Sequence, residues 1–295
     1  MDLFSPTFKA NPFPTYANMR QTCPVHGHES PFGGTIWYIT RHAEVEQVLK
    51  DAETFVKDPL NAKERTSKLK GKTLFNMINQ NMLFADAPDH TRLRKLVNLA
   101  FTPRRVETLT PRIQTIADEL LDAIGKKDTF DLIAEFAFPL PVTVIMEMLG
   151  IPEQDRDQMH NWTKAIIAPG RYGITSKGRK QRVRAFVDYL NKMFAQRRER
   201  PQEDLITGLV QAEADGERLS EAELSSMVAL LFVTGHETVV NLIGNGLLAL
   251  LARPEQKAQL QANPSLIEGA LEEMLRYDGP VETSTTRWAS RDVTL

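Results

Sequence analysis

The amino-acid sequence predicts a mainly α-helical protein with small β-sheets. Three features indicate this class. Apolar residues recur at helical spacing through most of the chain after residue 88, a long apolar segment at 221–252 begins with a helix cap, and the β-branched and aromatic runs are short. The expected helices span roughly 88–101, 105–124, 131–149, 153–167, 177–199, 204–213, 221–252 and 264–277. Proline or glycine stands at most of the junctions between them.

The N-terminal residues have a different pattern. Residues 16–22 and 41–50 predict short helices, and residues 35–40 have the β-branched and aromatic content of a strand. Residues 58–72 are polar and basic without an apolar period, which predicts a mobile loop. A second loop is expected around Pro169 and Gly170, between two long helices, where it could act as a lid.

Composition restricts the possible partners. The 295 residues are 42% hydrophobic and 25% charged, which suits a globular fold with a sizeable core. The net charge of −2 favours neither nucleic acid nor an anionic membrane, so a small-molecule partner is expected. The first residues lack a basic start and an apolar run, so we expect a cytoplasmic protein without a membrane anchor. Cys23 is the only cysteine, which excludes an internal disulfide and fits a reducing compartment.

The segment 221–252 carries the most informative pattern. Ser220 and Glu223 have the spacing of a capping box, and residues 227–251 are apolar around most of the expected helix, which predicts burial on nearly all sides. Four polar residues lie along one stripe of it: Thr234, Thr238, Asn241 and Asn245. They could bond to neighbouring backbone in a packed core or serve a binding site. Gly235, in the middle of the helix, suggests that something approaches the backbone closely.

Thr234-Gly235-His236-Glu237-Thr238 resembles the oxygen-activation motif of cytochromes P450, written A/G-G-x-D/E-T. The resemblance implies that Glu237 and Thr238 are catalytic and help to deliver protons during oxygen activation. It also implies that Thr234 and Gly235 lie against the heme, with the helix interrupted at 235–238 to receive it. Thr234 stands where the family usually has alanine or glycine.

Glu273 and Arg276 face the same side of the expected helix 264–277, which Asn263 and Pro264 would start. Taken alone, such a pair is common on solvated helix faces. The run E-E-M-L-R-Y, followed by Gly-Pro and T-T-R-W, resembles a second motif of the same family. The resemblance implies that Glu273 and Arg276 form its structural ion pair, buried and missing a third partner beyond residue 295.

His90 and Arg94 lie one turn apart at the start of the expected helix 88–101. This basic face, which also has Arg92 and Lys95 nearby, could simply be solvated. His and Arg donors on one face can also grip a carboxylate. D-x-P-x-H-x-x-x-R followed by F-T-P resembles the corresponding helix of bacterial family members, which implies that His90, Arg94 and, by its place in the sequence, Arg287 bind heme propionates.

The resemblance extends over nearly all 295 residues and implies one cytochrome P450 domain over 1–295, incomplete at the C-terminus. The implied cofactor is heme b (iron protoporphyrin IX). The implied reaction inserts one oxygen atom from O2 into a small hydrophobic substrate, with electrons from NAD(P)H through a ferredoxin or flavodoxin and its reductase. The implied substrate pocket lies between the loop after Asp58, the Pro169-Gly170 region, the long helix and residues 281–285.

No residue of this chain is expected to ligate the iron, because the family's F-x-x-G-x-x-x-C-x-G loop is absent and Cys23 lies near the start. Residues 285–295 look like the first strand of a hairpin with no returning strand. Two alternatives therefore stay open. The chain could be a truncated, catalytically inactive remnant of the family, or an unrelated all-helical regulator whose polar stripe recognises a partner.

Overall fold

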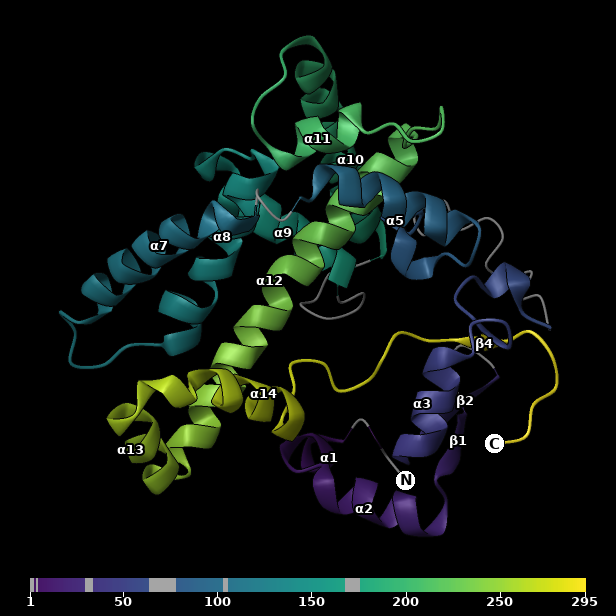
Figure 1. The fold of residues 1–295 in the computed structure, drawn as a ribbon, viewed down its shortest axis with the longest axis vertical. Helices are drawn as coiled ribbons and strands as arrows, with labels where there is room; N and C mark the ends of the chain where they lie inside the picture. Colours follow the sequence, from purple (N-terminus) through teal and green to yellow (C-terminus); the bar gives the residue numbers. More distant parts are fainter. Residues whose placement is uncertain (1–2, 4, 30–33, 64–77, 103–105, 168–175) are drawn as a thin grey trace. The chain divides into compact units, whose positions relative to one another are not determined.

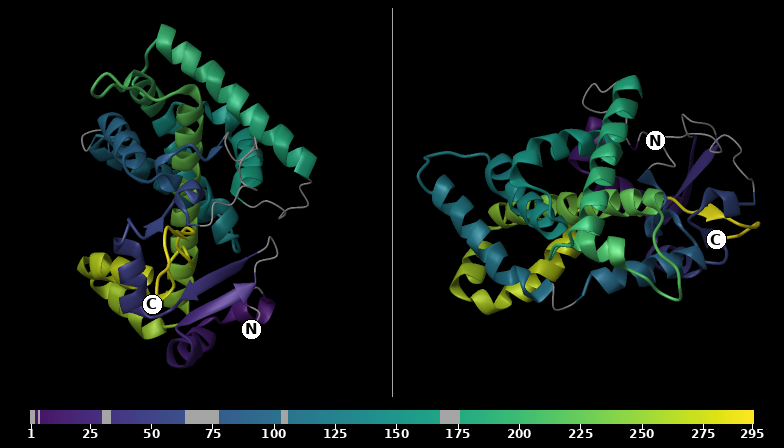
Figure 2. Two further views of the ribbon diagram at one scale, coloured as in Figure 1. Left: turned by 90° about the vertical axis from the view of Figure 1, so that its right-hand side faces the viewer. Right: turned by 90° about the horizontal axis from the view of Figure 1, so that it is seen from above.

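The computed structural model describes residues 3, 5–29, 34–63, 78–102, 106–167 and 176–295. Contacts between residues divide the chain into two compact units. Figures 1 and 2 show the ribbon, coloured from the N-terminus to the C-terminus. The first unit joins residues 1–70 to 286–295, and the second comprises 71–285. The sequence predicts a single domain, and that remains a prediction.

The first unit has short elements. Its helices are α1 (Pro6–Ala10), α2 (Phe13–Thr22) and α3 (His42–Lys50), with a 3-10 turn η1 (Pro59–Asn61). Strands β1 (Val25–Glu29) and β2 (Thr35–Ile39) pair antiparallel, with Gly27 opposite Trp37. The expected helices at 16–22 and 41–50 and the strand at 35–40 are confirmed, whereas α1 and β1 were not predicted. Most of the expected loop 58–72 lies outside the described residues.

The last ten residues complete the first unit. Strand β4 (Trp288–Ala289) pairs antiparallel with β3 (Phe55–Val56), so the expected unpaired strand at 285–295 is wrong in both length and partner. Beside the pair, the Ser290 amide donates to Thr54 O over 2.8 Å, and Lys63 Nζ lies 2.5 Å from Asp292 Oδ2. A strand 232 places earlier in the chain could not be recognised as the partner from the local sequence pattern.

The second unit is helical. It contains α5 (Asp89–Ala100), α7 (Leu109–Ile124), α8 (Pro139–Leu149), α9 (Arg156–Ile167), α10 (Ser176–Glu199), α11 (Leu205–Gln211), α12 (Glu221–Leu251), α13 (Pro254–Ala262) and α14 (Ile267–Tyr277). Shorter turns are the 3-10 elements η3 (Met82–Phe84), η5 (Glu153–Asp155) and η6 (Pro264–Leu266), and the π-helical turn η4 (Ile133–Ala137). The mainly α fold class is confirmed.

Several expected helices differ at their starts. The helix expected over 131–149 is divided into the π-turn η4 and α8, and the one expected over 264–277 opens with η6. Asn263 does not cap that turn, because its Oδ1 accepts from Ser265 Oγ instead. The missed helix α13 lies between Pro254 and Asn263, where the polar run gives little apolar period.

Helix α12 is the central rod of the second unit, with α13 and α14 at its C-terminal end (Figure 1). The expected capping box is confirmed, because Ser220 Oγ accepts from the Glu223 amide while Glu223 Oε2 accepts from the Ser220 amide. Its 31 residues form one continuous helix, about 46 Å long at about 1.5 Å per residue.

Burial of α12 changes along its length. Leu224, Met227, Val228 and Phe232 belong to the core of the second unit, packed with residues of α5, α8, α10 and α11. Further along, Leu248 is 67% exposed, so the expected burial on nearly all sides is wrong for the C-terminal half. Among the described helices, α12 alone is long and apolar enough to cross a membrane by length and composition, a test that core helices also pass.

Candidate heme-facing site

Thr234 and Thr238 lie on the side of α12 away from His236. Residues two places before and after a helical residue point roughly away from it, and His236 is buried while Thr234 is exposed and Thr238 half-buried. Thr234 Oγ1 donates to Leu230 O and Thr238 Oγ1 donates to Thr234 O, each over 2.8 Å. The helix is continuous through these residues, so the expected interruption at 235–238 is wrong for this structure.

A neighbouring helix approaches α12 closely at Gly235, as a glycine in the middle of a helix predicts. A β-carbon at Gly235 would lie 3.0 Å from Ile145 Cδ1, on the neighbouring helix α8. The same glycine is exposed on its other side. Side-chain packing by α8 therefore accounts for the absence of a side chain here without any cofactor.

His236 anchors this turn of α12 in the core. Its ring is 4% exposed and packs against Phe138 and Phe232, with ring centroids 6.1 and 5.1 Å away. Nδ1 lies 2.6 Å from Phe232 O, which makes Nδ1 the protonated nitrogen of the neutral ring. Burial lowers the pKa of His236 despite that hydrogen bond, so the ring stays neutral near pH 7.

The other two polar residues of the stripe hold the segment after α14. Asn241 Nδ2 donates to Pro280 O over 3.3 Å, and Asn245 Nδ2 donates to Asp278 O over 3.2 Å. All four polar residues of the stripe thus bond to backbone, which was the plain alternative for them. The hydroxyl oxygens of Thr234 and Thr238 can still accept hydrogen bonds.

Helix α5 separates its basic residues into two flanks. The buried residues Leu93, Leu96, Val97 and Ala100 form its apolar face, as their helical spacing in the sequence predicts. At about 100° per residue, His90 and Arg94 fall on one flank of that face and Arg92 and Lys95 on the other. Within the described part of the chain, the side chains of His90 and Arg94 make no hydrogen bond or ion pair. Both side chains are therefore available to donate hydrogen bonds to a ligand.

The opposite flank is neutralised. Arg92 forms ion pairs with Asp89, Glu217 and Glu223, and Lys95 Nζ lies 2.6 Å from Asp215 Oδ2. The sequence indicated a solvated basic face for Arg92. Its carboxylate partners lie more than 120 residues away, apart from Asp89, so the local pattern could not reveal them.

Glu273 and Arg276 form the expected pair on α14. Two hydrogen bonds of 2.6 Å join the guanidinium to the carboxylate, and they hold the pKa of Glu273 below its ordinary value. The side chains are 58% and 69% exposed, so the expected burial is wrong in this structure.

Arg287 lies in the first unit, whereas His90 and Arg94 lie in the second, so the three predicted propionate ligands are not placed relative to one another. Burial lowers the pKa of the Arg287 guanidinium. Cys23 is exposed, and its Sγ donates to Val25 O over 3.3 Å.

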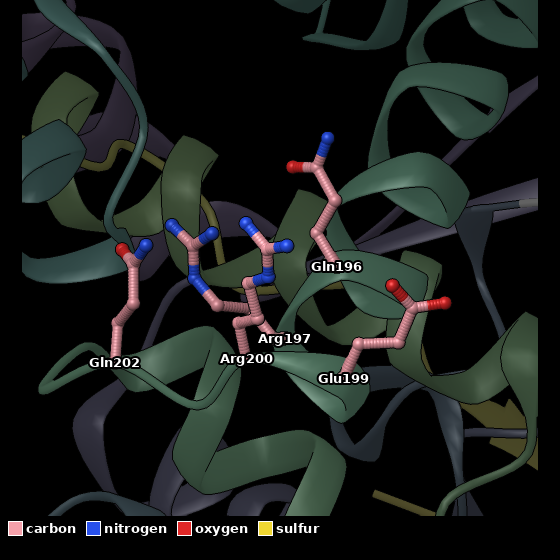
Figure 3. A pocket seen from close by; sticks show the side chains of 5 residues that line it. All are labelled: Gln196, Arg197, Glu199, Arg200 and Gln202. Carbon is pink, nitrogen blue, oxygen red and sulfur yellow. The ribbon is translucent and has the colours of Figure 1, made fainter.

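Two surface pockets stand out in the described part of the chain, and neither is lined by a predicted site residue. One, of about 270 Å³, lies at the end of α10 between Gln196, Arg197, Glu199, Arg200 and Gln202 (Figure 3). The other is lined by Glu153, Gln154, Arg156 and Asp157. Charged and amide side chains line both pockets, which does not suit an apolar substrate.

Comparison with known proteins establishes the family. The family model described as Cytochrome P450 matches residues 31–295. Cytochrome P450 107B1 of Saccharopolyspora erythraea is 44% identical over 98% of this chain and 71% of its own length. The solved structure of the bacillaene polyketide synthase cytochrome P450 PksS of Bacillus subtilis has a TM-score of 0.90 at 39% identity, covering 100% of this chain and 73% of that one. Myxobacterial CYP267B1, solved with myristic acid, has a TM-score of 0.88 at 43% identity, over 97% and 72%.

A long helix carrying T-G-H-E-T, inside a mainly helical fold shared with these structures, defines a heme monooxygenase. The chain belongs to the cytochrome P450 family. Family members are oxidoreductases that bind heme iron, and the fold seen here is the cytochrome P450 fold over the part that the chain spans.

Proposed function

We propose that this chain supplies the heme-facing helices of a monooxygenase that inserts one oxygen atom from O2 into a small, largely apolar organic molecule. The observation that carries the proposal is the open face of α12 at Thr234 and Thr238, on the other side of the helix from buried His236. The names of PksS and of CYP267B1 with myristic acid support a polyketide-like or fatty-acid-like substrate.

The donors on the open flank of α5 fit the carboxylates of heme b. We assign His90 and Arg94 to its propionates, because both side chains lack partners in the described structure and Arg can bind a carboxylate in bidentate fashion. Arg287 is assigned by resemblance alone. Thr234 and Gly235, exposed on α12, would face the ring. When bound, heme supplies the activation of O2.

Glu237 and Thr238 would handle protons at this face. Thr238 Oγ1 already donates its proton to Thr234 O, so its lone pairs are available to accept a hydrogen bond from a water or a substrate hydroxyl. Glu237 is half-buried, where a carboxyl group can still exchange protons with solvent. Together they would pass a proton from solvent toward the open face.

We also propose a domain organisation, electron donors and a location for the protein. Residues 1–295 would belong to one domain, since the family match runs through both compact units. Electrons would come from NAD(P)H through a ferredoxin or flavodoxin and its reductase. The balanced charge and single cysteine support a cytoplasmic protein that binds no nucleic acid.

A second candidate is a catalytically inactive cytochrome P450 remnant. One observation favours it: the 295 residues contain no cysteine except Cys23, which is exposed beside a proline near the N-terminus. The axial thiolate of the family therefore has no candidate in these residues.

Heme titration of the 295-residue chain tests the assignment. We expect His90→Gln and Arg94→Gln each to weaken heme binding about tenfold, because each removes a hydrogen bond to a charged group. Lys95→Gln is the matched control, since Lys95 lies on the same helix but pairs with Asp215, and it should change affinity less than about twofold. Equal effects of all three variants would refute the propionate assignment.

The carbon monoxide difference spectrum of the reduced, heme-loaded chain tests the second candidate. We expect no thiolate-type Soret band from these 295 residues. Such a band would show that the chain provides an axial thiolate and would exclude the inactive remnant.

A further inference from the structure

The two flanks of α5 differ in what surrounds them. Arg92 is 27% exposed and faces three carboxylates, with Nε 3.3 Å from Glu217 Oε2 and 3.7 Å from Asp89 Oδ1, and with Glu223 bound through the terminal nitrogen. These contacts raise the pKa of Arg92, chiefly through the hydrogen bond to Glu223. On the opposite flank, His90 and Arg94 have no partner among the described residues.

Glu223 joins α5 to the first turn of α12. Its side chain is 15% exposed, and it accepts from Arg92 while also accepting from the Ser220 amide over 2.8 Å. Burial opposes ionisation of Glu223, but the Arg92 and Ser220 hydrogen bonds outweigh it and hold the pKa below its ordinary value. One carboxylate therefore both caps α12 and binds α5.

A second tie joins the residues before α5 to the same turns of α12. The Gln80 amide donates to Ser226 Oγ over 3.2 Å, and Asn81 Nδ2 donates to Ser226 O over 3.4 Å. Helix α5 itself packs against α11 and η3. These polar links tie the helix and the residues before it to α12.

We propose that Arg92 is a positioning residue that fixes the roll of α5, so that His90 and Arg94 point toward the heme propionates. The inference rests on the proposed function of these two residues. Helix α5 with its side chains is about 10–12 Å across, so a roll of about 20° would move the end of a side chain by about 2 Å. A shift of that size breaks a hydrogen bond, whose useful range is only a few tenths of an ångström.

Charge-removing variants at both ends of the link test the proposal. Arg92→Gln and Glu223→Gln each remove one charge, and glutamine at 223 still serves the capping box, so α12 should keep its start. Arg92→Lys keeps the positive charge, and Lys95→Gln removes an exposed ion pair from the same flank. The full chain, labelled with 15N-histidine, is measured with and without heme.

We expect Arg92→Gln and Glu223→Gln each to weaken heme binding about fivefold to tenfold. The double variant should bind heme no more weakly than either single variant, because both substitutions break the same link. Arg92→Lys should recover at least half of the loss, and Lys95→Gln should stay within about twofold of the unaltered chain. Without heme, the imidazole resonances of His90 should shift in Arg92→Gln and stay in place in Lys95→Gln.

Unshifted His90 resonances in both Arg92→Gln and Glu223→Gln would overturn the positioning role whether or not heme binds. Failure of the unaltered chain to bind heme, or normal binding by His90→Gln and Arg94→Gln, would instead overturn the proposed function. The resonances of His90 would still decide the role of Arg92 in that case.

Discussion

Gly150 and Asp204 meet so closely that a β-carbon on Gly150 would lie 2.1 Å from Asp204 Oδ2. Gly150 ends α8 with a φ of +74°, a conformation that side chains disfavour. We expect Gly150→Ala to lower the free energy of unfolding by about 3 kcal/mol or more, from backbone strain and displacement of Asp204. Urea unfolding measures the change.

Gly216 provides the control for that prediction. Its φ is +79°, but nothing lies within 4 Å of the added carbon. Gly216→Ala should therefore show backbone strain alone, about 1 kcal/mol. Equal losses in the two variants would contradict the steric explanation at Gly150.

Arg197 and Asp204 form an ion pair with side chains only 8% and 6% exposed. Arg197 also donates to Gly150 O over 3.0 Å, and Asp204 caps α11 at the Thr207 amide. We expect Arg197→Met to cost about 3–5 kcal/mol, because the carboxylate of Asp204 would be left buried without its partner. Chemical denaturation at pH 7 gives the value.

Adding Asp204→Asn to Arg197→Met should restore part of the lost stability. Asparagine keeps the helix cap and removes the unpaired charge. A double variant less stable than Arg197→Met alone would show that the charge of Asp204 is not the cause.

Acid should destabilise the second unit through His236 and His160. Burial is the main cause of the lowered pKa of both, and Lys164 and His236 lower that of His160 further. The unfolded chain protonates near its ordinary pKa of about 6.5, so it binds more protons than the folded chain below that pH. The free energy of unfolding should be constant above about pH 6.5 and fall as pH drops below it, by at most about 1.4 kcal/mol per pH unit for each histidine.

Unfolding midpoints measured from pH 5 to 8 check this dependence. His160→Gln and His236→Asn should each flatten the slope. His42→Gln, at an exposed position of α3, is the control and should leave the slope unchanged. An unaltered slope in all three variants would mean that other groups cause the acid sensitivity.

Glu273 and Arg276 should contribute little to the stability of this chain. Their bidentate pair is well formed but open to solvent. Hydrogen bonds to water therefore replace most of the interaction energy that is lost when the pair is broken. We expect Glu273→Gln to leave the thermal unfolding midpoint within about 1 °C of the unaltered chain. A large drop would show that the pair has a partner that this structure does not reveal.

Local patterns in the sequence predicted most of the helical fold. The capping box at Ser220 and Glu223, the apolar face of α5 and the pairing of Glu273 with Arg276 depend on residues within a few positions of each other. Spacing alone determines which of these side chains share a helix face.

The features that were missed depend on contacts between distant residues. The partner of β4 is β3, more than 200 residues earlier, and the close neighbour of Gly235 is Ile145 on another helix. The burial of α12 was overestimated because composition does not reveal which side of a helix its neighbours cover. The distinct environments of Arg92 and Arg94 could not be separated by residue type for the same reason.

The pairing of β3 with β4 has a consequence for synthesis on the ribosome. Residues 55–56 emerge early, but their partners at 288–289 are translated more than 200 residues later. The residues of the second unit, 71–285, are therefore all made before the first unit can close. Residues 55–56 of the nascent protein therefore stay without their strand partner until residues 288–289 have been translated.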